Sequence, residues 1–228
     1  MMEDNVTGFR PLNFKDEEKE IAKALSVLKK HGLNIRLPAE LQKRLSSTIL
    51  FDGDDGLFKE LIDDVDVYFE YGCGKSTEYT YYYSNAKIFS VDTSRVWATR
   101  VSAIDTARIN VTWVDVGEVR KWGYPISYRM RHNFKVYAET LWQTENKPEL
   151  VLIDGRFRVF CFLTTVMNAP LGTKVLFDDY TNRPAYHIVE EVSPILETCG
   201  RQALFEVSAE SKNRTTSAMA SSFQNVME

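Results

Sequence analysis

The stretch VDVYFEYGCGKST (residues 65–77) decides the fold of this chain. Its aromatic and β-branched residues predict a strand that ends at Tyr71, the glycines at 72 and 74 predict a turn, and a helix is expected from Ser76. A glycine turn of this kind lets the backbone approach a ligand closely and leaves free amides at the start of the helix. The stretch therefore predicts a strand–turn–helix unit that can hold a ligand at its turn.

The same pattern continues toward the C-terminus, as short apolar runs separated by segments of helix length. Strands are predicted at residues 65–71, 87–91, 110–114, 150–153, 174–177 and 203–207, and helices at 76–84, 94–104, 157–168 and 184–199. Parallel strands need crossover connections, so this alternation predicts an α/β fold of Rossmann-like type, with a mostly parallel, doubly wound sheet in a three-layer α/β/α sandwich. Ligands of such sheets bind outside the carboxyl ends of the strands.

One such domain is expected, over residues 65–207, with a segment on each side of it. Residues 1–64 are expected to form an N-terminal helical extension, since amphipathic patterns predict one helix at 16–31 and a second that starts at Pro38. Residues 208–228 are rich in serine, alanine and asparagine and show little periodicity. We expect them to be a C-terminal tail, either weakly ordered or a poorly marked last element.

The composition narrows the class of function. Hydrophobic residues make up 44% of the 228 residues and charged residues 26%, as in ordinary globular proteins, and the formal net charge of -4 argues against nucleic acid as a partner. The most apolar stretch, residues 157–167, is shorter than the roughly 20 residues that cross a bilayer, so no membrane association is expected. The three cysteines form no Cys-x-x-Cys pair and no signal-like segment opens the sequence, which predicts a cytoplasmic protein.

Two common ligand classes fit the glycine turn poorly. Gly74, Lys75 and Ser76 match the end of a P-loop, but a P-loop NTPase needs a glycine five residues before Gly74, where Phe69 stands. An NTPase stays as a less favoured alternative. A dinucleotide site needs a third glycine, and Thr77 occupies that position.

The acidic and glycine residues around the turn suit a ligand in which a nucleoside is joined to an amino acid. Gly72 and Gly74 leave room for the amino-acid part, and Glu70 can help to hold its ammonium group. Asp92, which ends the second strand, can accept hydrogen bonds from both ribose hydroxyls. The alternative is structural: the glycines only make a turn, and Asp92 caps the helix that begins near Ser94.

This pairing of an acidic Gly-x-Gly turn with Asp92 resembles the class I S-adenosylmethionine-dependent methyltransferases. The resemblance implies that S-adenosylmethionine is the cofactor and that Asp92 binds its ribose. It also implies an adenine contact just after the third strand, from Asp115 or the amide of Val116. The residues expected to bind the cofactor are therefore Glu70, Gly72, Gly74, Ser76, Asp92, Thr93, Asp115 and Val116.

A second group of acidic residues follows the fourth and fifth strands. Asp154, Asp178 and Asp179 are expected to meet at the edge of the sheet that the glycine turn occupies. Three carboxylates suit Mg²⁺ or another divalent cation, and the arrangement looks like the metal site of divalent-dependent O-methyltransferases. In the sugar-modifying members of that group an acid two residues after the first ligand is commonly the base, and here Arg156 stands there. A helix cap at Asp154 and a turn at the aspartate pair explain the same pattern.

Basic residues accompany these aspartates. Arg156, Arg158 and Arg183 are expected to bind a carboxylate or phosphate of the substrate, or else to neutralise the aspartates. His187, four residues after Arg183 on the predicted helix, is a candidate general base, although a single histidine more often has a structural role. The predicted catalytic residues are thus Asp154 and His187.

Residues 117–149 are long for a connection and rich in aromatic and basic side chains, which indicates a substrate lid, a packed helix or a dimer surface. The motif WGYP (122–125) together with DGRFR (154–158) resembles a little-characterised methyltransferase-like family over residues 65–200. This second resemblance implies no particular substrate. Together with the likeness of the aspartates to the O-methyltransferase metal site, we expect an enzyme that O-methylates a small-molecule acceptor, hydroxylated or anionic. A catalytically silent module that binds the cofactor is the alternative.

Overall fold

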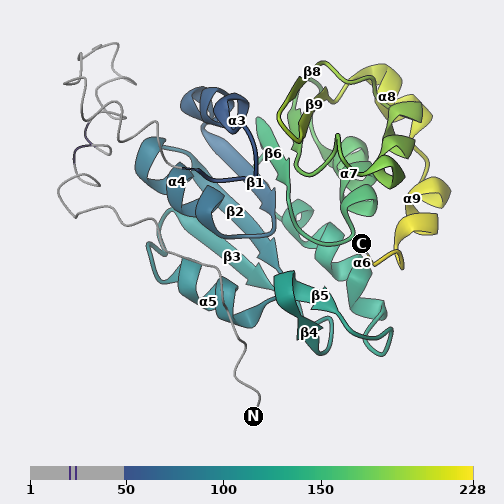
Figure 1. The fold of residues 1–228 in the computed structure, drawn as a ribbon, viewed down its shortest axis with the longest axis horizontal. Coiled ribbons are helices and arrows are strands. Elements are labelled where there is room, and N and C mark those ends of the chain that lie inside the picture. Colours follow the sequence, from purple (N-terminus) through teal and green to yellow (C-terminus); the bar gives the residue numbers. More distant parts are fainter. Residues whose placement is uncertain (1–20, 22–23, 25–48, 228) are drawn as a thin grey trace.

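The computed structural model describes residues 21, 24 and 49–227 (Figure 1). Of the helix expected at 16–31 only residues 21 and 24 are among them, and the helix expected from Pro38 lies outside the described residues. The described part of the N-terminal extension contains the short helices α3 (Gly56–Leu61) and η1 (Ile62–Asp64), which lead into the first strand.

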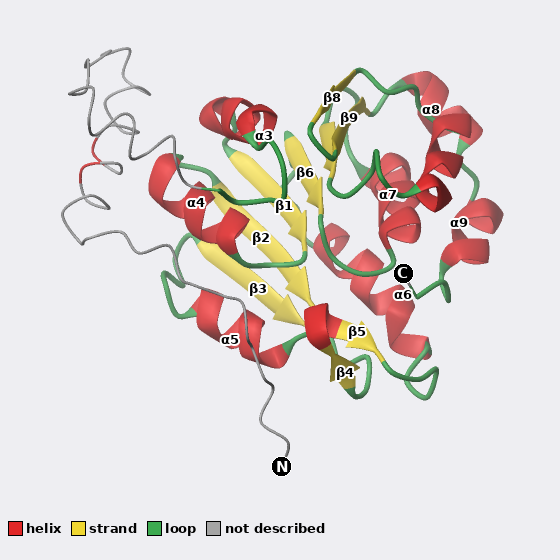
Figure 2. Ribbon diagram, in the orientation of Figure 1, coloured by secondary structure: helices red, strands yellow, loops and turns green. Residues whose placement is uncertain are grey.

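A seven-stranded sheet forms the centre of the molecule, with the strand order β3-β2-β1-β6-β7-β9-β8 (Figure 2). The strands β1, β2, β3, β6 and β7 run parallel, and β9 pairs antiparallel with both β7 and β8. Their bounds are Val67–Tyr71 (β1), Lys87–Asp92 (β2), Ile109–Trp113 (β3), Leu150–Ile153 (β6), Lys174–Phe177 (β7), Glu197–Cys199 (β8) and Gln202–Glu206 (β9). The predicted mostly parallel α/β sheet is confirmed, and its parallel strands bring their carboxyl ends to one edge.

Helices cover both faces of the sheet, because strand side chains alternate between two apolar cores. On one face Tyr68 and Ile88 share a core with residues of α3, α4 (Lys75–Tyr83) and α5 (Arg95–Ser102). On the other face Phe69 and Val151 share a core with residues of a second set of helices. These are α6 (His132–Glu139), η3 (Thr140–Gln143), α7 (Arg158–Asn168), η4 (Pro184–Glu191) and α9 (Ser217–Phe223). The three layers are thus helix, sheet and helix.

Helix α7 is enclosed by the second core and carries part of the carboxyl edge. Its residues from Arg158 to Val166 are all buried, as the apolar sequence of the helix requires. The ring of Phe162 packs edge to face on Phe205 of β9, with 4.9 Å between ring centres, and burial of such a ring contributes about 1.5–3 kcal/mol to folding. Since α7 starts directly after the DGRF turn, this packing also holds Asp154 and Arg158 in place.

The predicted helix at 184–199 is wrong in its second half. The helical part, η4, is a 3₁₀ helix that ends at Glu191. Pro194 follows, and proline has no N–H to donate and clashes with the preceding turn of a helix. Residues 197–199 instead form β8, which turns back at Gly200 (φ 56°) to pair with β9.

Two segments carry elements that the sequence pattern did not mark. Within residues 117–149 a small hairpin, β4 (Val119–Arg120) and β5 (Tyr124–Pro125) around the 3₁₀ turn η2 (Lys121–Gly123), precedes α6. In the C-terminal segment α8 (Ala209–Arg214) begins at a capping box on Ser208, and α9 begins at Thr216, whose hydroxyl accepts the Met219 amide. Among the described residues no helix has both the length and the apolar character needed to cross a membrane.

Candidate functional site

The glycine turn after β1 and the turn after β6 touch through their backbones. The Gly72 amide donates to the carbonyl of Val91 (2.8 Å), and the Asp154 amide donates to that of Tyr71 (3.0 Å). A Cβ on Gly72 would lie 2.9 Å from the Cα of Gly155, and a Cβ on Gly155 would lie 2.9 Å from the nitrogen of Gly72. Gly72 also has a φ of 92°, which favours glycine. The two turns can meet only because neither glycine has a side chain.

The carboxylate of Glu70 is fully buried and ties the turn to its neighbours. Four hydroxyls donate to it, from Tyr68 (2.9 Å), Ser76 (2.8 Å), Ser90 (2.5 Å) and Thr77. Burial raises the pKa of Glu70, and the hydrogen bonds oppose that rise. This placement corrects the expectation that Glu70 holds the ammonium group of a ligand: its oxygens are enclosed, and they join β1 to α4 and β2.

Two further residues that were expected to bind a cofactor also turn their hydroxyls inward. Ser76 is buried and donates to Glu70. Thr93 is buried and donates to the carbonyl of Gly123 in η2 (2.7 Å). The hydroxyls of Ser76 and Thr93 are therefore bonded within the protein, which leaves only the backbone of these residues for contact with a ligand.

Asp92 lies at the carboxyl end of β2 and points to the glycine turn. Its Oδ2 accepts the amide of Cys73 (2.9 Å), and its Oδ1 accepts the amide of Ser94 (2.6 Å). Burial raises the pKa of Asp92, while these amides and Arg156 oppose the rise. Asp92 thus lies between the glycine turn and the start of α5, where the N-cap residue is Ser94 rather than Asp92.

The residues expected at the adenine differ in exposure. The chain after β3 stays beside β2, because the Val114 amide donates to the carbonyl of Asp92 (2.9 Å). Asp115 is exposed, and its carboxylate accepts the amide of Gly117 (2.9 Å). Val116 is buried in the second core. Asp115 therefore lies at the same carboxyl edge as Asp92, where its side chain is exposed to solvent.

The Gly-Lys-Ser sequence does not form a phosphate loop. Helix α4 begins at Lys75, directly after Gly74, so the turn is too short to wrap a chain of phosphates. The Lys75 ammonium group donates to the carbonyl of Ile49 (3.4 Å), and the Ser76 hydroxyl is buried against Glu70. The structure therefore gives no support to the NTPase alternative.

The three aspartates after β6 and β7 come together as predicted. One carboxylate oxygen from each of Asp154, Asp178 and Asp179 lies within 4.8 Å of the others. Asp179 has a φ of 58°, so the chain turns sharply after β7 and directs this carboxylate back toward Asp154. Such a set of oxygens has the chemistry of a divalent-cation site.

Arginines occupy much of this cluster. Arg158 is buried, and its Nη2 lies 2.9 Å from Asp154 and 3.3 Å from Asp179. Asp179 also pairs with Arg183 (2.5 Å) and Arg201 (2.7 Å). Of the predicted anion-binding arginines, Arg158 and Arg183 therefore neutralise aspartates, which was the alternative for them. Arg201 was not predicted, because it follows an unrecognised hairpin turn at Gly200.

Two carboxyl groups of the cluster have raised pKa values in spite of the arginines. Burial and the nearby Asp154 raise the pKa of Asp178 to about 8, although Arg158 and Gln202 oppose this. Burial also raises the pKa of Asp154, against the attraction of Arg158. Carboxylates that are this crowded favour a proton or a cation between them.

Arg156 is placed between the two groups of aspartates. It acts electrostatically on both Asp92 and Asp154, and its guanidinium lies 5.7 Å from the ring centre of Tyr124. Arg120 stacks on the same ring at 4.2 Å. Burial, and then repulsion by Arg158, lower the pKa of Arg156. A cationic, aromatic wall therefore borders the carboxyl edge.

His187 stays apart from the carboxylates. Its ring stacks on Tyr180 at 4.9 Å between centres, its Nε2 lies 3.2 Å from the Tyr180 carbonyl, and its Nδ1 lies 4.0 Å from Glu190. Within the described residues none of its contacts reaches Asp154, Asp178 or Asp179. This geometry favours the structural role over that of a general base.

Tyr137 of α6 is a residue of the site that the sequence did not reveal. Its hydroxyl accepts the amide of Arg156 (3.4 Å) and fills the space where a side chain on Gly155 would stand. It is almost fully buried, and its ring packs on Phe157 and Tyr71. No local pattern marks it, because its partner lies nineteen positions further along the chain.

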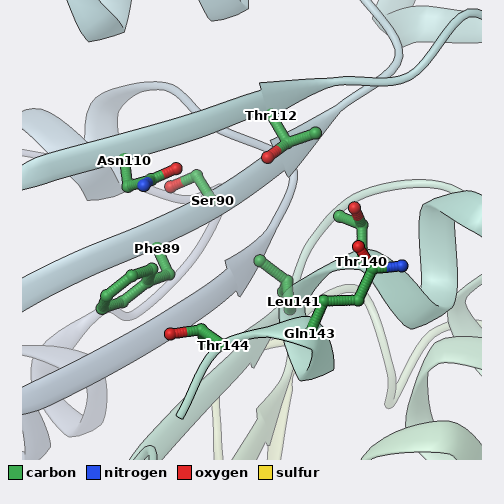
Figure 3. Close-up of a pocket in the computed structure, with 8 residues that line it drawn as sticks. All are labelled: Phe89, Ser90, Asn110, Thr112, Thr140, Leu141, Gln143 and Thr144. Carbon is green, nitrogen blue, oxygen red and sulfur yellow. The ribbon is translucent and has the colours of Figure 1, made fainter. Parts of the chain in front are cut away.

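A cavity of about 230 Å³ lies elsewhere, on the second face of the sheet between β2, β3 and η3 (Figure 3). Its lining is uncharged: Phe89, Ser90, Asn110, Thr112, Thr140, Leu141, Gln143 and Thr144. None of the predicted site residues contributes to it. The candidate functional site is therefore the carboxyl edge, where Asp92, the glycine turn and Asp154 meet.

Comparisons with known proteins agree with this fold. A methyltransferase-like protein from Silicibacter pomeroyi is 30% identical, with a TM-score of 0.61, over 77% of this chain and 88% of that protein. An O-methyltransferase from Bacillus cereus, solved with S-adenosylhomocysteine, is 14% identical, with a TM-score of 0.45, over 86% of this chain and 92% of that one. MycE, a methyltransferase of mycinamycin biosynthesis solved with Mg and S-adenosylhomocysteine, is 15% identical, with a TM-score of 0.45, over 90% of this chain and 62% of that one. Neither family models nor curated proteins gave a match to the sequence.

The parallel sheet and the acidic glycine turn at its carboxyl edge define a Rossmann-like protein. The chain belongs to the family of the methyltransferase-like protein from Silicibacter pomeroyi, and its fold is that of the class I S-adenosylmethionine-dependent methyltransferases.

Proposed function

We propose that this chain is an S-adenosylmethionine-dependent methyltransferase that methylates a hydroxyl of a small hydroxylated or anionic acceptor. The observation that carries the proposal is the link between Asp92 and the glycine turn, in which the Asp92 carboxylate accepts the Cys73 amide at the carboxyl edge. We call Asp92 and residues 72–74 the donor site. A carboxylate beside a turn without bulky side chains suits a ligand that joins ribose hydroxyls to an amino acid.

The donor site has the hydrogen-bonding capacity for such a cofactor. Each oxygen of Asp92 accepts one backbone amide, from Cys73 or Ser94, and the Cys73 thiol, a weak donor, also hydrogen-bonds to this carboxylate. A carboxylate has about four acceptor positions, so capacity remains for a ribose hydroxyl. At Gly74 a Cβ would meet no atom within 4 Å, so the turn is open there. Hydroxyl donors would also offset the burial that raises the pKa of Asp92.

We assign to Asp154 the contact with the hydroxyl group of the acceptor. S-adenosylmethionine supplies an electrophilic methyl group on a positively charged sulfur. The protein has to hold the acceptor oxygen in line with that group, and such positioning supplies much of the rate enhancement. The Asp154 side chain is 33% exposed, whereas that of Asp179 is 9% exposed, so Asp154 is the more accessible of the two. Its backbone touches Gly72, which supports a place beside the donor site.

Arg156 supports an anionic acceptor. It lies at the same edge, near both Asp92 and Asp154, and a guanidinium there can pair with a carboxylate or phosphate. Arg158 and Arg183 have no part in this proposal, because they already pair with Asp154 and Asp179. His187 has none either, since its ring packs on Tyr180.

A divalent cation at the aspartate cluster is a second element of the proposal. It is supported by the three oxygens within 4.8 Å of one another, and Asp179 is its weakest ligand because three arginines hold it. Crystals soaked with Mn²⁺ and S-adenosylhomocysteine are expected to show an anomalous peak at Asp154 and Asp178. Absence of that peak would reject the cation and leave the Arg–Asp network as the role of Asp178 and Asp179, without bearing on the contact of Asp154 with the acceptor.

Calorimetry tests the cofactor directly. The full chain is titrated with S-adenosylhomocysteine, ATP and NAD, and only the first is expected to bind. Binding of ATP or NAD alone would reject the proposal. If S-adenosylhomocysteine binds and radiolabelled methyl groups pass to none of a panel of hydroxylated and anionic acceptors, the silent cofactor-binding module becomes the better description.

A further inference from the structure

The β4–η2–β5 hairpin ends at the donor site. Figure 2 shows it beyond the tips of β2 and β3, at the carboxyl edge of the sheet. Trp122 (φ 66°) and Gly123 (φ 67°) are consecutive residues in the left-handed region, so the chain turns sharply at this point. A tryptophan rarely adopts that conformation, and strain of this kind persists where the surrounding structure enforces it.

Gly123 faces the two residues at the end of β2. Its carbonyl accepts the Thr93 hydroxyl (2.7 Å), and it is buried. A Cβ on Gly123 would overlap the Thr93 hydroxyl and would lie 3.8 Å from the Oδ1 of Asp92. No space therefore remains between hairpin and strand for a side chain at this position.

The next residue of the hairpin, Tyr124, is anchored as well. The guanidinium groups of Arg120 and Arg156 lie 4.2 Å and 5.7 Å from the centre of the Tyr124 ring, and the Tyr124 hydroxyl donates to the carbonyl of Met227. Because the hairpin is held at both Thr93 and Tyr124, it cannot yield to a larger residue at 123 without losing one of these contacts.

We propose that Gly123 and Thr93 are positioning residues of the donor site. Gly123 sets the width of the site at Asp92, and the Thr93 hydroxyl holds the hairpin at that width. The inference rests on the proposed function, since it assumes that Asp92 binds the ribose of the cofactor. It assigns to the WGYP segment a role in binding the methyl donor, through its backbone, rather than the acceptor.

The test measures the affinity of the full chain for S-adenosylhomocysteine by calorimetry. Gly123→Ala is expected to raise the Kd at least about tenfold, because the added methyl group displaces the hairpin or intrudes toward Asp92. Thr93→Val is expected to raise it about two- to tenfold by removing one hydrogen bond, and Thr93→Ser to restore it. Where the variants turn over, the change should fall on the KM for the donor rather than on kcat.

Gly172→Ala is the matched control. Gly172 also has a positive φ (86°), but a Cβ there would meet no atom within 4 Å, so this variant carries the backbone strain without the obstruction. Its Kd is expected to equal that of the wild type. Equal affinities for Gly123→Ala and Gly172→Ala, with wild type binding, would overturn the inference alone. A wild type that does not bind S-adenosylhomocysteine would overturn the proposed function and the inference with it.

Discussion

The Asp92 carboxylate and the Cys73 amide, 2.9 Å apart, join the ends of two adjacent parallel strands. The hydrogen bond spans nineteen positions of sequence and orients the acid toward the glycine turn. The buried Glu70 performs the complementary task inside the protein, where four hydroxyls hold α4 and β2 to β1. Asp92 thus contacts the glycine turn directly, whereas Glu70 holds the elements that support the turn.

Removal of the Asp92 carboxylate should abolish most of the affinity for the cofactor. Asp92→Ala is expected to weaken binding of S-adenosylhomocysteine at least about a hundredfold, because two charge-assisted hydrogen bonds to ribose are lost. Calorimetry measures this. Asp115→Ala is the control, since Asp115 also follows a strand at this edge but is exposed and bonded to its own turn. A loss of affinity of equal size in both variants would show that the effect is not specific to the Asp92 carboxylate.

Substitution of two glycines of the carboxyl edge, Gly155 and Gly74, should separate folding from binding. Gly155→Ala is expected to lower the free energy of unfolding by roughly 2–4 kcal/mol, because its methyl group overlaps Tyr137 and the backbone of Gly72. Gly74→Ala should cost less than about 1 kcal/mol, since nothing lies within 4 Å of its Cβ, and should instead weaken cofactor binding. Urea unfolding and calorimetry check the pair. The interpretation fails if Gly74→Ala is the less stable variant.

The buried Glu70 should make stability depend on pH. Burial raises its pKa in the folded chain above the ordinary value of 4.5, so folding favours the protonated form. Its contribution is present in full below the unfolded pKa and is lost as the pH rises toward the folded pKa, with a slope of at most about 1.4 kcal/mol per pH unit. Urea unfolding between that ordinary value and neutral pH should therefore show a steeper fall for wild type than for Glu70→Gln. Glu118→Gln, at an exposed position, should keep the wild-type slope.

Arg158 should be the cation on which the aspartate cluster most depends. Arg158→Met is expected to lower the free energy of unfolding by about 3–5 kcal/mol, because Asp154 and Asp179 lose a buried partner. Arg183→Met should cost less than about 1 kcal/mol, since the Arg183 side chain is 40% exposed. Thermal unfolding of both variants compares them. Costs of equal size would mean that burial does not distinguish the two arginines.

Much of the fold could be predicted because its signals are local. The strands Leu150–Ile153 and Lys174–Phe177 consist of apolar residues apart from Lys174, and both were predicted with the bounds that the structure shows. The strand β8 was missed because Glu197–Cys199 is short and partly exposed, and only its pairing with β9 makes it a strand. The helix predicted at 184–199 was extended beyond Pro194 because the local pattern does not show the pairing of β8 with β9.

The sequence by itself determined which residues stand at the carboxyl edge, since a strand that ends in an acid or a glycine must place that residue there. Only the tertiary structure decided what each one does. Glu70 and Asp92 read alike as acids beside strand ends, yet one is enclosed by hydroxyls and the other joins the turn. The roles of Tyr137, Arg201 and Gly123 depend on partners far along the chain. Spacing encodes the period of a strand or helix, but the partner of a polar group is set by how the elements pack.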